Sequence, residues 1–267
     1  MATPPLPGKA LLPLAGAPLL ERMVQRVLSA SSDFQLVVAT STRQEDDALR
    51  ELCRCIDVKC AGGHPTDLLD RVFHIACDER ADEVGLIPLS SPLIDPATVD
   101  AVVQFSARDD RAFDYVSNLH PASYPAGNDV ELLPFAVLET AWKEARREYE
   151  RTHITPYCWD NPGRFRIGNV QWADGPNGSM SHRWCLEFPE DYLFVRAVFD
   201  ELWSVRRPVF PLRDILRLTM ARPDLSGINS HLAGVNWYRH HLHELKTISE
   251  TDTRRLPSSP DQQIRAL

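Results

Sequence analysis

The residues best suited to phosphate chemistry stand in the first nineteen positions. A turn at Pro7-Gly8 carries Lys9, and a second turn over residues 16–18 precedes a stretch with helical periodicity over residues 19–28. Glycine lets a backbone approach a phosphate closely, and lysine supplies a mobile positive charge. Gly8 and Lys9 are therefore candidate nucleotide-binding residues; the alternative is an exposed lysine on a turn.

Carboxylates on one face of a strand are the second candidate group. Asp129 and Glu131 flank Val130 on an expected strand, so their side chains point to the same face. Two such carboxylates repel each other unless a cation or an arginine lies between them. They either bind a metal or orient an acceptor molecule, or they form a structural salt bridge.

Other polar residues stand at expected element ends. Glu187 either ligates a metal or places a negative charge at the start of the next helix. His153 either touches an acceptor or is a buried or capping histidine. Asp70 either brackets a nucleotide or belongs to the scaffold, and Arg183 either supplies charge at an anionic site or lies on the surface.

Composition narrows the possible partners. The chain has 267 residues, 43% of them hydrophobic, with a net charge of −8, which suits one globular domain. A non-specific nucleic-acid binder is usually basic, so we expect no nucleic-acid partner. No apolar run approaches the roughly 20 residues that span a bilayer, so we expect no membrane contact and a cytoplasmic protein. The six cysteines lack a zinc or disulfide pattern and are expected to be reduced.

Strands alternate with helices along the chain. Strands are expected over residues 35–40, 58–61, 84–89, 115–118, 130–133, 165–170 and 184–186, and helices over 19–28, 45–54, 67–81, 96–106, 134–150, 190–202 and 211–218. This alternation predicts a three-layer α/β sandwich with a mostly parallel sheet wrapped on both faces. Residues 1–246 are expected to form the domain, with a loop over 173–182, an insert or arm near 111–183 that packs on a second copy in a homodimer, and a disordered tail over 247–267.

The order of short motifs resembles a known family. The motifs are Leu6-Pro7-Gly8-Lys9 with the turn that follows, Val37–Ser41 with Asp46-Asp47, Asp67–Arg71, Pro92–Pro96, Ser117 to Glu131, Tyr149–Tyr157 and Pro189–Asp191. Together they are similar to the spore-coat polysaccharide cytidylyltransferases, relatives of the CMP-sialic acid and CMP-KDO synthetases.

The resemblance implies a nucleotide-diphospho-sugar transferase-like fold and a Mg²⁺-dependent reaction. Such enzymes join CTP to a sugar acid, a sugar phosphate or a related anionic molecule and release pyrophosphate. The residues implied are Gly8, Lys9, Ser90 and Asp70 at the nucleotide, Glu187 at Mg²⁺, and Asp129, Glu131 and His153 around the acceptor. Lys9 and Glu187 are expected to face one another across the triphosphate.

Three departures from the family pattern stand out. Relatives begin with a strand before the Leu-Pro-Gly-Lys motif, so here we expect an open slot in the sheet or a different strand pairing. Ser90 stands where relatives have a metal-binding aspartate, and Glu187 replaces a second aspartate. The alternative function is therefore a catalytically impaired homologue that acts as a nucleotide-binding or assembly module. A transferase that uses an activated nucleotide-sugar is disfavoured, because no Asp-x-Asp motif is present.

Overall fold

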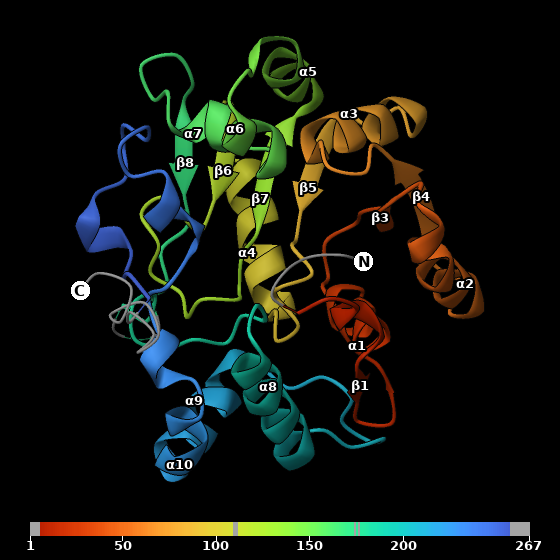
Figure 1. Ribbon diagram of the computed structural model, residues 1–267, viewed down its shortest axis with the longest axis vertical. Coiled ribbons are helices and arrows are strands. Elements are labelled where there is room, and N and C mark those ends of the chain that lie inside the picture. Colours follow the sequence, from red (N-terminus) through yellow and green to blue (C-terminus); the bar gives the residue numbers. More distant parts are fainter. Residues whose placement is uncertain (1–5, 109–111, 174, 176, 257–267) are drawn as a thin grey trace, which may run out of the picture.

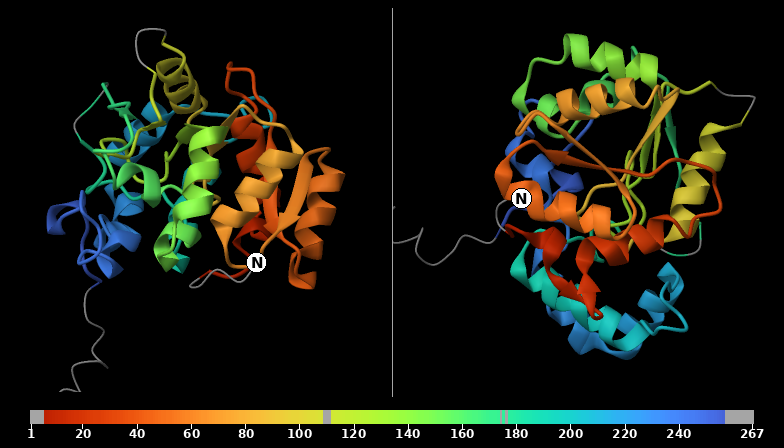
Figure 2. Two further views of the ribbon diagram at one scale, coloured as in Figure 1. Left: turned by 90° about the horizontal axis from the view of Figure 1, so that it is seen from above. Right: turned by 90° about the vertical axis from the view of Figure 1, so that its right-hand side faces the viewer.

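The computed structural model describes residues 6–108, 112–173, 175 and 177–256, and it carries helices on both sides of its strands (Figures 1 and 2). The strands are β1 (Pro13–Leu14), β2 (Ala17–Pro18), β3 (Val37–Ser41), β4 (Lys59–Gly63), β5 (Glu83–Leu86), β6 (Tyr115–Ser117), β7 (Glu131–Pro134) and β8 (Ile167–Asn169). The α-helices are α1 (Leu19–Val27), α2 (Asp47–Cys55), α3 (Leu68–Asp78), α4 (Pro96–Ser106), α5 (Phe135–Glu144), α6 (Glu148–Thr152), α7 (Pro156–Trp159), α8 (Pro189–Leu202), α9 (Leu212–Ala221) and α10 (Pro223–Gly227).

The largest sheet is mixed, with one reversed strand. Its order is β5-β7-β6-β8. β7 runs antiparallel to both β5 and β6, and β6 runs parallel to β8, so three of the four strands share one direction. This confirms the predicted α/β class with mostly parallel strands.

A second sheet contains only β3 and β4, paired in parallel from Val37 against Lys59 to Ser41 against Gly63. Among the described residues, no main-chain hydrogen bond joins β3 to β5, and Ala39 and Gly85 in these strands are exposed. The expected slot between neighbouring strands is therefore present. Residues 1–5, which precede the Leu-Pro-Gly-Lys motif, lie outside the described ranges.

Two layers of helices bury opposite faces of the strands. On one face, Met23 and Val27 of α1 and Val99 and Val102 of α4 pack with Val116, Val130 and Leu132. On the other face, Leu69 of α3, Leu138 and Ala141 of α5 and Tyr149 of α6 pack with Tyr115 and Leu133. Because side chains alternate along a strand, neighbouring Leu132 and Leu133 serve the two layers. A further cluster joins α8 and α9 to Leu14, Trp184 and Leu186 beside the sheet.

Two predicted elements differ from the structure. The helix predicted over residues 134–150 is two helices, α5 and α6, because Ala145 adopts an extended backbone and a Glu150 carboxylate oxygen accepts the N–H groups of Arg146 and Arg147, each at 2.9 Å. Residues 184–186 are extended but are not a strand. Trp184 N–H donates to Ala126 at 2.8 Å and Leu186 N–H donates to Ser90 at 2.8 Å, so the hydrogen bonds go to two different segments.

The predicted insert and tail also need correction. β6, β7 and β8 lie within residues 111–183, so most of this region belongs to the main sheet. Part of the predicted tail packs on the domain: Thr247 N–H and its hydroxyl donate to Asp160 at 2.8 and 2.9 Å, and Thr253 is buried. Residues 257–267 lie outside the described ranges. All six cysteines are free, as predicted. Within the described residues, no helix combines the length and apolar character needed to cross a bilayer.

Arg26 on α1 is buried and holds three segments together. Its guanidinium donates to the carbonyl oxygens of Leu93, Ile94 and Phe210 at 3.2, 2.9 and 2.9 Å, and it lies 4.4 Å from the centre of the Phe210 ring. These carbonyl groups belong to the Pro92–Pro96 motif and to the chain leading into α9, so one side chain satisfies acceptors that burial separates from water.

We predict that Arg26→Met lowers the free energy of unfolding by about 3 kcal/mol, because three buried carbonyl groups lose their donor. Urea unfolding measures the change. Arg54→Met on α2 is the control, because Arg54 is 74% exposed and, among the described residues, pairs only with its helix neighbour Glu51; it should cost less than about 0.5 kcal/mol. Equal losses in the two variants would contradict this role for Arg26.

Candidate active site

One peptide segment joins the lysine turn to the loop after β5. The Lys9 ammonium group donates to the Leu186 carbonyl oxygen at 3.1 Å, and the Leu186 N–H donates to the Ser90 carbonyl oxygen at 2.8 Å. Gly8, immediately before, has φ of 73°, a left-handed conformation that glycine adopts without strain. The structure thus brings Gly8, Lys9 and Ser90 together at the residue preceding Glu187.

The electrostatic environment of Lys9 places Glu187 beside it. Burial lowers the pKa of Lys9, while the negative charge of Glu187 is the largest influence that raises it. Lys9 and Glu187 are 178 positions apart by number but share one site, since Lys9 contacts the residue next to Glu187. The structure therefore places Lys9 next to the residue that precedes Glu187, and their arrangement across a triphosphate stays a prediction.

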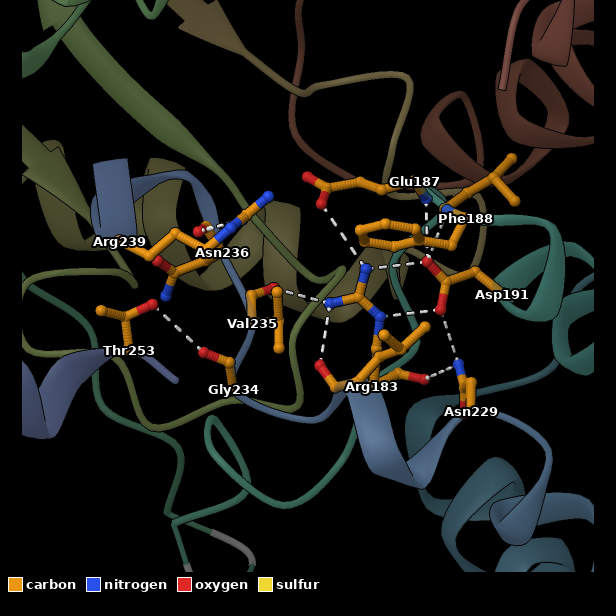
Figure 3. Close-up of polar contacts among 12 residues, drawn as sticks. Arg183, Glu187, Phe188, Asp191, Asn229, Gly234, Val235, Asn236, Arg239 and Thr253 are labelled. Atoms are coloured by element: carbon orange, nitrogen blue, oxygen red, sulfur yellow. Dashed lines mark hydrogen bonds and ion pairs between the residues drawn. The ribbon is translucent and has the colours of Figure 1, made fainter. Parts of the chain in front are cut away.

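A buried ion pair holds the loop that carries Glu187 (Figure 3). The Arg183 guanidinium donates to both carboxylate oxygens of Asp191, at 2.7 and 2.8 Å, and both side chains are almost completely buried. Asp191 also accepts the N–H groups of Glu187 and Phe188, at 3.0 and 2.9 Å, which caps the start of α8. Arg183 lies 3.5 Å from the Glu187 carboxylate, so it is a positioning residue rather than a free cation at the site.

Asp129 follows a glycine that lets two chains approach closely. Gly127 has φ of 96°, and a Cβ atom there would lie only 2.5 Å from the Cys185 nitrogen. The Gly127 N–H donates to the Asp129 carboxylate at 3.3 Å. Burial and, to a smaller extent, the charge of Glu187 raise the pKa of Asp129 to about 6, although the Gly127 hydrogen bond opposes the shift. Asp129 and Glu187 are therefore electrostatic neighbours.

Glu131 begins β7 and faces the layer of α6 and α7. Its carboxylate accepts the Tyr115 hydroxyl at 2.6 Å and the Thr155 hydroxyl at 2.5 Å. Burial raises the pKa of Glu131 to about 7, although these two donors oppose the shift. Asp129 acts on Glu131 in the same direction as burial, as expected for two carboxylates on one strand face.

His153 lies in an aromatic wall rather than among carboxylates. Its ring stacks on Trp237 with centroids 3.9 Å apart, and burial lowers its pKa to about 4. His120 stacks in the same manner on Trp159, with centroids 4.1 Å apart. Tyr238 lies edge-on to Trp159 at 5.9 Å, and burial, with the charges of Glu131 and Asp129, raises its pKa. This aromatic wall, made of His153, Trp237, His120, Trp159 and Tyr238, therefore borders the carboxylates of Asp129 and Glu131.

Asp70 is engaged elsewhere among the described residues. Its carboxylate accepts the Trp142 indole N–H at 2.9 Å and lies 3.5 Å from His74, which connects α3 to α5. Among the described residues, no hydrogen bond or ion pair joins Asp70 to Lys9 or Glu187, so the structure separates it from the other predicted nucleotide residues.

Several residues at this site carried no clear signal in the sequence. Asn229 donates to Asp191 at 2.9 Å, and Tyr238 and Arg239 approach from the chain after α10, where no periodicity predicts a return to the site. Asp191 did have a signal, because it belongs to the Pro189–Asp191 motif. Its partner Arg183 could be proposed only as one of several arginines.

The layered fold and the site define a class: an α/β protein with the nucleotide-diphospho-sugar transferase fold. A family model described as cytidylyltransferase matches residues 5–203, and the chain belongs to that family. The residues after 203 lie beyond that match.

Curated relatives agree with this family. The chain is 26% identical over 232 residues to the spore coat polysaccharide biosynthesis protein SpsF of Bacillus subtilis, covering 84% of this chain and 92% of the relative. It is 32% identical over 162 residues to the uncharacterized protein MJ1063 of Methanocaldococcus jannaschii, covering 61% of this chain and 65% of the relative. It is 30% identical over 98 residues to 3-deoxy-manno-octulosonate cytidylyltransferase of Trichlorobacter lovleyi, covering 37% and 38%.

Solved structures show the same fold. A cytidylyltransferase from Leptospira borgpetersenii superposes with a TM-score of 0.78 at 24% identity, covering 84% of this chain and 92% of that one. A CMP:2-keto-3-deoxy-manno-octonic acid synthetase complexed with CTP superposes with a TM-score of 0.54 at 18% identity, covering 73% and 93%.

We predict that Asp191→Asn lowers the free energy of unfolding by about 3 kcal/mol, because it leaves the buried Arg183 charge without its partner and turns an amide donor toward other donors. Chemical denaturation monitors the loss. Asp200→Asn, an exposed change on the same helix α8, should be nearly neutral. A neutral Asp191→Asn would show that the pair does not hold the loop.

Acid should destabilise the protein partly through His153. An unfolded histidine binds a proton near pH 6.5, whereas folded His153 does so only near pH 4. Its contribution is therefore fully present above pH 6.5 and is lost as the pH falls toward 4. In this window the parent takes up a proton at His153 when it unfolds. His153→Phe keeps a ring on Trp237 but cannot bind that proton, so it should take up as much as about one proton fewer than the parent on unfolding.

The measurement is guanidinium unfolding between pH 4.5 and pH 7.5. His231→Phe serves as the control, because His231 is exposed and should leave the pH dependence unchanged. A His153→Phe variant with the same pH dependence as the parent would refute the assignment.

Proposed function

We propose that this protein is a CTP-dependent nucleotidyltransferase that activates a sugar acid, a sugar phosphate or a related anionic molecule and releases pyrophosphate. One observation carries the proposal. In a chain of the cytidylyltransferase family, the Lys9 ammonium group, the Ser90 loop and the backbone before Glu187 meet at Leu186. The relative from Trichlorobacter lovleyi, named for a sugar acid substrate, supports the acceptor class.

The reaction forms a bond between an acceptor hydroxyl oxygen and the α-phosphorus of CTP. The bond from that phosphorus to the bridging oxygen of the β-phosphate breaks, pyrophosphate leaves, and the hydroxyl proton is given up to solvent. Lys9 contributes positive charge beside the phosphates, where developing negative charge needs stabilisation. Asp129 and Glu131 accept hydrogen bonds from acceptor hydroxyl groups and so orient the attacking oxygen.

The residues present fit Mg²⁺ with fewer carboxylates than the family pattern. Within the described ranges no group of three or more His, Cys, Asp or Glu side chains converges, and Ser90 offers a neutral hydroxyl. Mg²⁺ commonly takes one or two carboxylates, with waters and substrate phosphates as its remaining ligands. Glu187 would supply one such carboxylate: its side chain is 36% exposed, and its charge acts on the neighbouring Asp129. When bound there, the ion would neutralise charge on the triphosphate.

We predict that Lys9→Ala lowers kcat/KM for pyrophosphate release by about 100-fold or more, because a cation aimed at the phosphates is lost. The assay contains CTP, Mg²⁺ and a panel of sugar acids. Lys143→Ala is the matched control, because Lys143 lies on α5, is 56% exposed and, in the part of the chain that the structure describes, pairs only with Glu139; its rate should equal that of the parent.

The same assay, together with calorimetry, distinguishes the proposed enzyme from the alternative function. The replacement of the family aspartate by Ser90 favours an impaired homologue as the second candidate. CTP binding by calorimetry without pyrophosphate release for any acceptor would support that module and overturn the enzyme.

A further inference from the structure

The chain after α10 returns to the candidate site. Arg183 donates to the carbonyl oxygens of Leu232 and Val235 at 3.2 and 2.7 Å, and Asn229 donates to the Arg183 carbonyl oxygen at 2.9 Å. Asn236 in turn donates to the Asp252 carbonyl oxygen at 3.0 Å. This segment, residues 228–256, lies beyond the part of the chain that the family model matches. Side chains that it brings to the site are therefore features of this chain in addition to the family motifs.

A short 3-10 helix, η4 (Trp237–His240), presents the segment to the site. Asn236 caps it by accepting the Tyr238 N–H at 3.0 Å, which fixes the start of the turn. Trp237 stacks on His153, and Tyr238 borders Glu131 and Asp129, as described above. The next residue, Arg239, therefore lies at the edge of the proposed acceptor region, on a turn that Asn236 caps.

The Arg239 guanidinium is only partly used. One terminal nitrogen, Nη1, donates to the Asn236 carbonyl oxygen, whereas Nε is buried without a hydrogen-bond partner. Among the residues that the structure describes, no carboxylate lies within the 4.0 Å that defines an ion pair with Arg239. A buried N–H donor without an acceptor is costly, so this edge of the guanidinium is suited to an incoming group.

Arg239 points toward the space beside Glu187 (Figure 3). The Glu187 charge acts on Arg239, and that carboxylate also lies 3.5 Å from Arg183. Arg183 thus partly offsets the negative charge that would otherwise repel an anion from Arg239. Nε and Nη2 together form the planar, two-donor edge that binds a carboxylate through both oxygens.

We propose that Arg239 binds the anionic group of the acceptor, a carboxylate of a sugar acid, through Nε and Nη2. The inference rests on the proposed function, because it assigns one ligand of that reaction. A phosphate of CTP has related chemistry. The acceptor is favoured because Arg239 comes from the same turn as Tyr238, and Tyr238 borders the two carboxylates that the proposed function assigns to the acceptor.

Steady-state kinetics test the proposal in Arg239→Gln, with 3-deoxy-manno-octulosonate and N-acetylneuraminate as acceptors. We expect KM for the acceptor to rise by about 30-fold, with KM for CTP unchanged, because a charge-assisted bidentate contact is lost. Arg239→Lys keeps the charge but not the two-donor edge and should recover only part of the affinity. For the carboxamide of the better acceptor, the parent and Arg239→Gln should give the same KM.

Arg255→Gln is the matched control, because Arg255 is in the same segment, is 83% exposed and has Glu250 as its only ion-pair partner within the described ranges. Thermal unfolding confirms that each variant folds. A rise in KM for CTP, an unchanged acceptor KM, or an equal loss with the carboxamide would overturn the assignment to Arg239. Absence of pyrophosphate release from the parent with every acceptor would instead refute the proposed function and the assignment with it.

Discussion

The ion pair between Arg183 and Asp191 is the interaction on which the site depends. Asp191 accepts five hydrogen bonds, from Arg183, Asn229 and the backbone of the loop that carries Glu187, while Arg183 reaches the chain after α10. Burial of a charge is costly unless its partners satisfy it, and here each group is satisfied by the other. One pair therefore aligns three segments: the Glu187 loop, the first turn of α8 and the C-terminal segment that brings Arg239.

A second constraint is the shared use of Leu186. Its carbonyl oxygen receives Lys9 and its N–H reaches Ser90, so the lysine turn and the loop after β5 are fixed to the same residue. Under the proposed function, a phosphate that reaches Lys9 would replace the Leu186 carbonyl oxygen as its acceptor rather than meet a free ammonium group. This arrangement pre-positions the lysine and limits the reorganisation needed at binding.

The sequence predicted the α/β class and most of the elements, because local motifs and periodicity carry that information. It also singled out Lys9 and the motifs around Glu187, and the structure brings Lys9 to Leu186, the residue before Glu187. The break at Ala145 escaped prediction, since the stretch around it favours a helix and only Glu150 compensates the freed N–H groups. The role of Asp191 and the return of Tyr238 and Arg239 also escaped it. Asp191 is only eight positions from Arg183, but nothing in the sequence singles that arginine out among the others. Tyr238 and Arg239 lie far in sequence from Asp129, Glu131 and Glu187, so tertiary packing rather than a local pattern brings them to the site.

The separation of the β3–β4 pair from the four-stranded sheet has a consequence for cooperativity. In the described part of the chain, the β3–β4 pair is held to the remainder by side-chain packing, such as Leu49 and Cys53 of α2 against Leu20 and Val24 of α1, and by the stacking of Phe73 on Trp142. Among the described residues, no strand-to-strand hydrogen bonding continues from this pair into the β5-β7-β6-β8 sheet. The lobe of β3, β4 and α2 is thus a natural unit for sub-global opening, in which its backbone amides exchange with solvent hydrogen before those of the β5-β7-β6-β8 sheet.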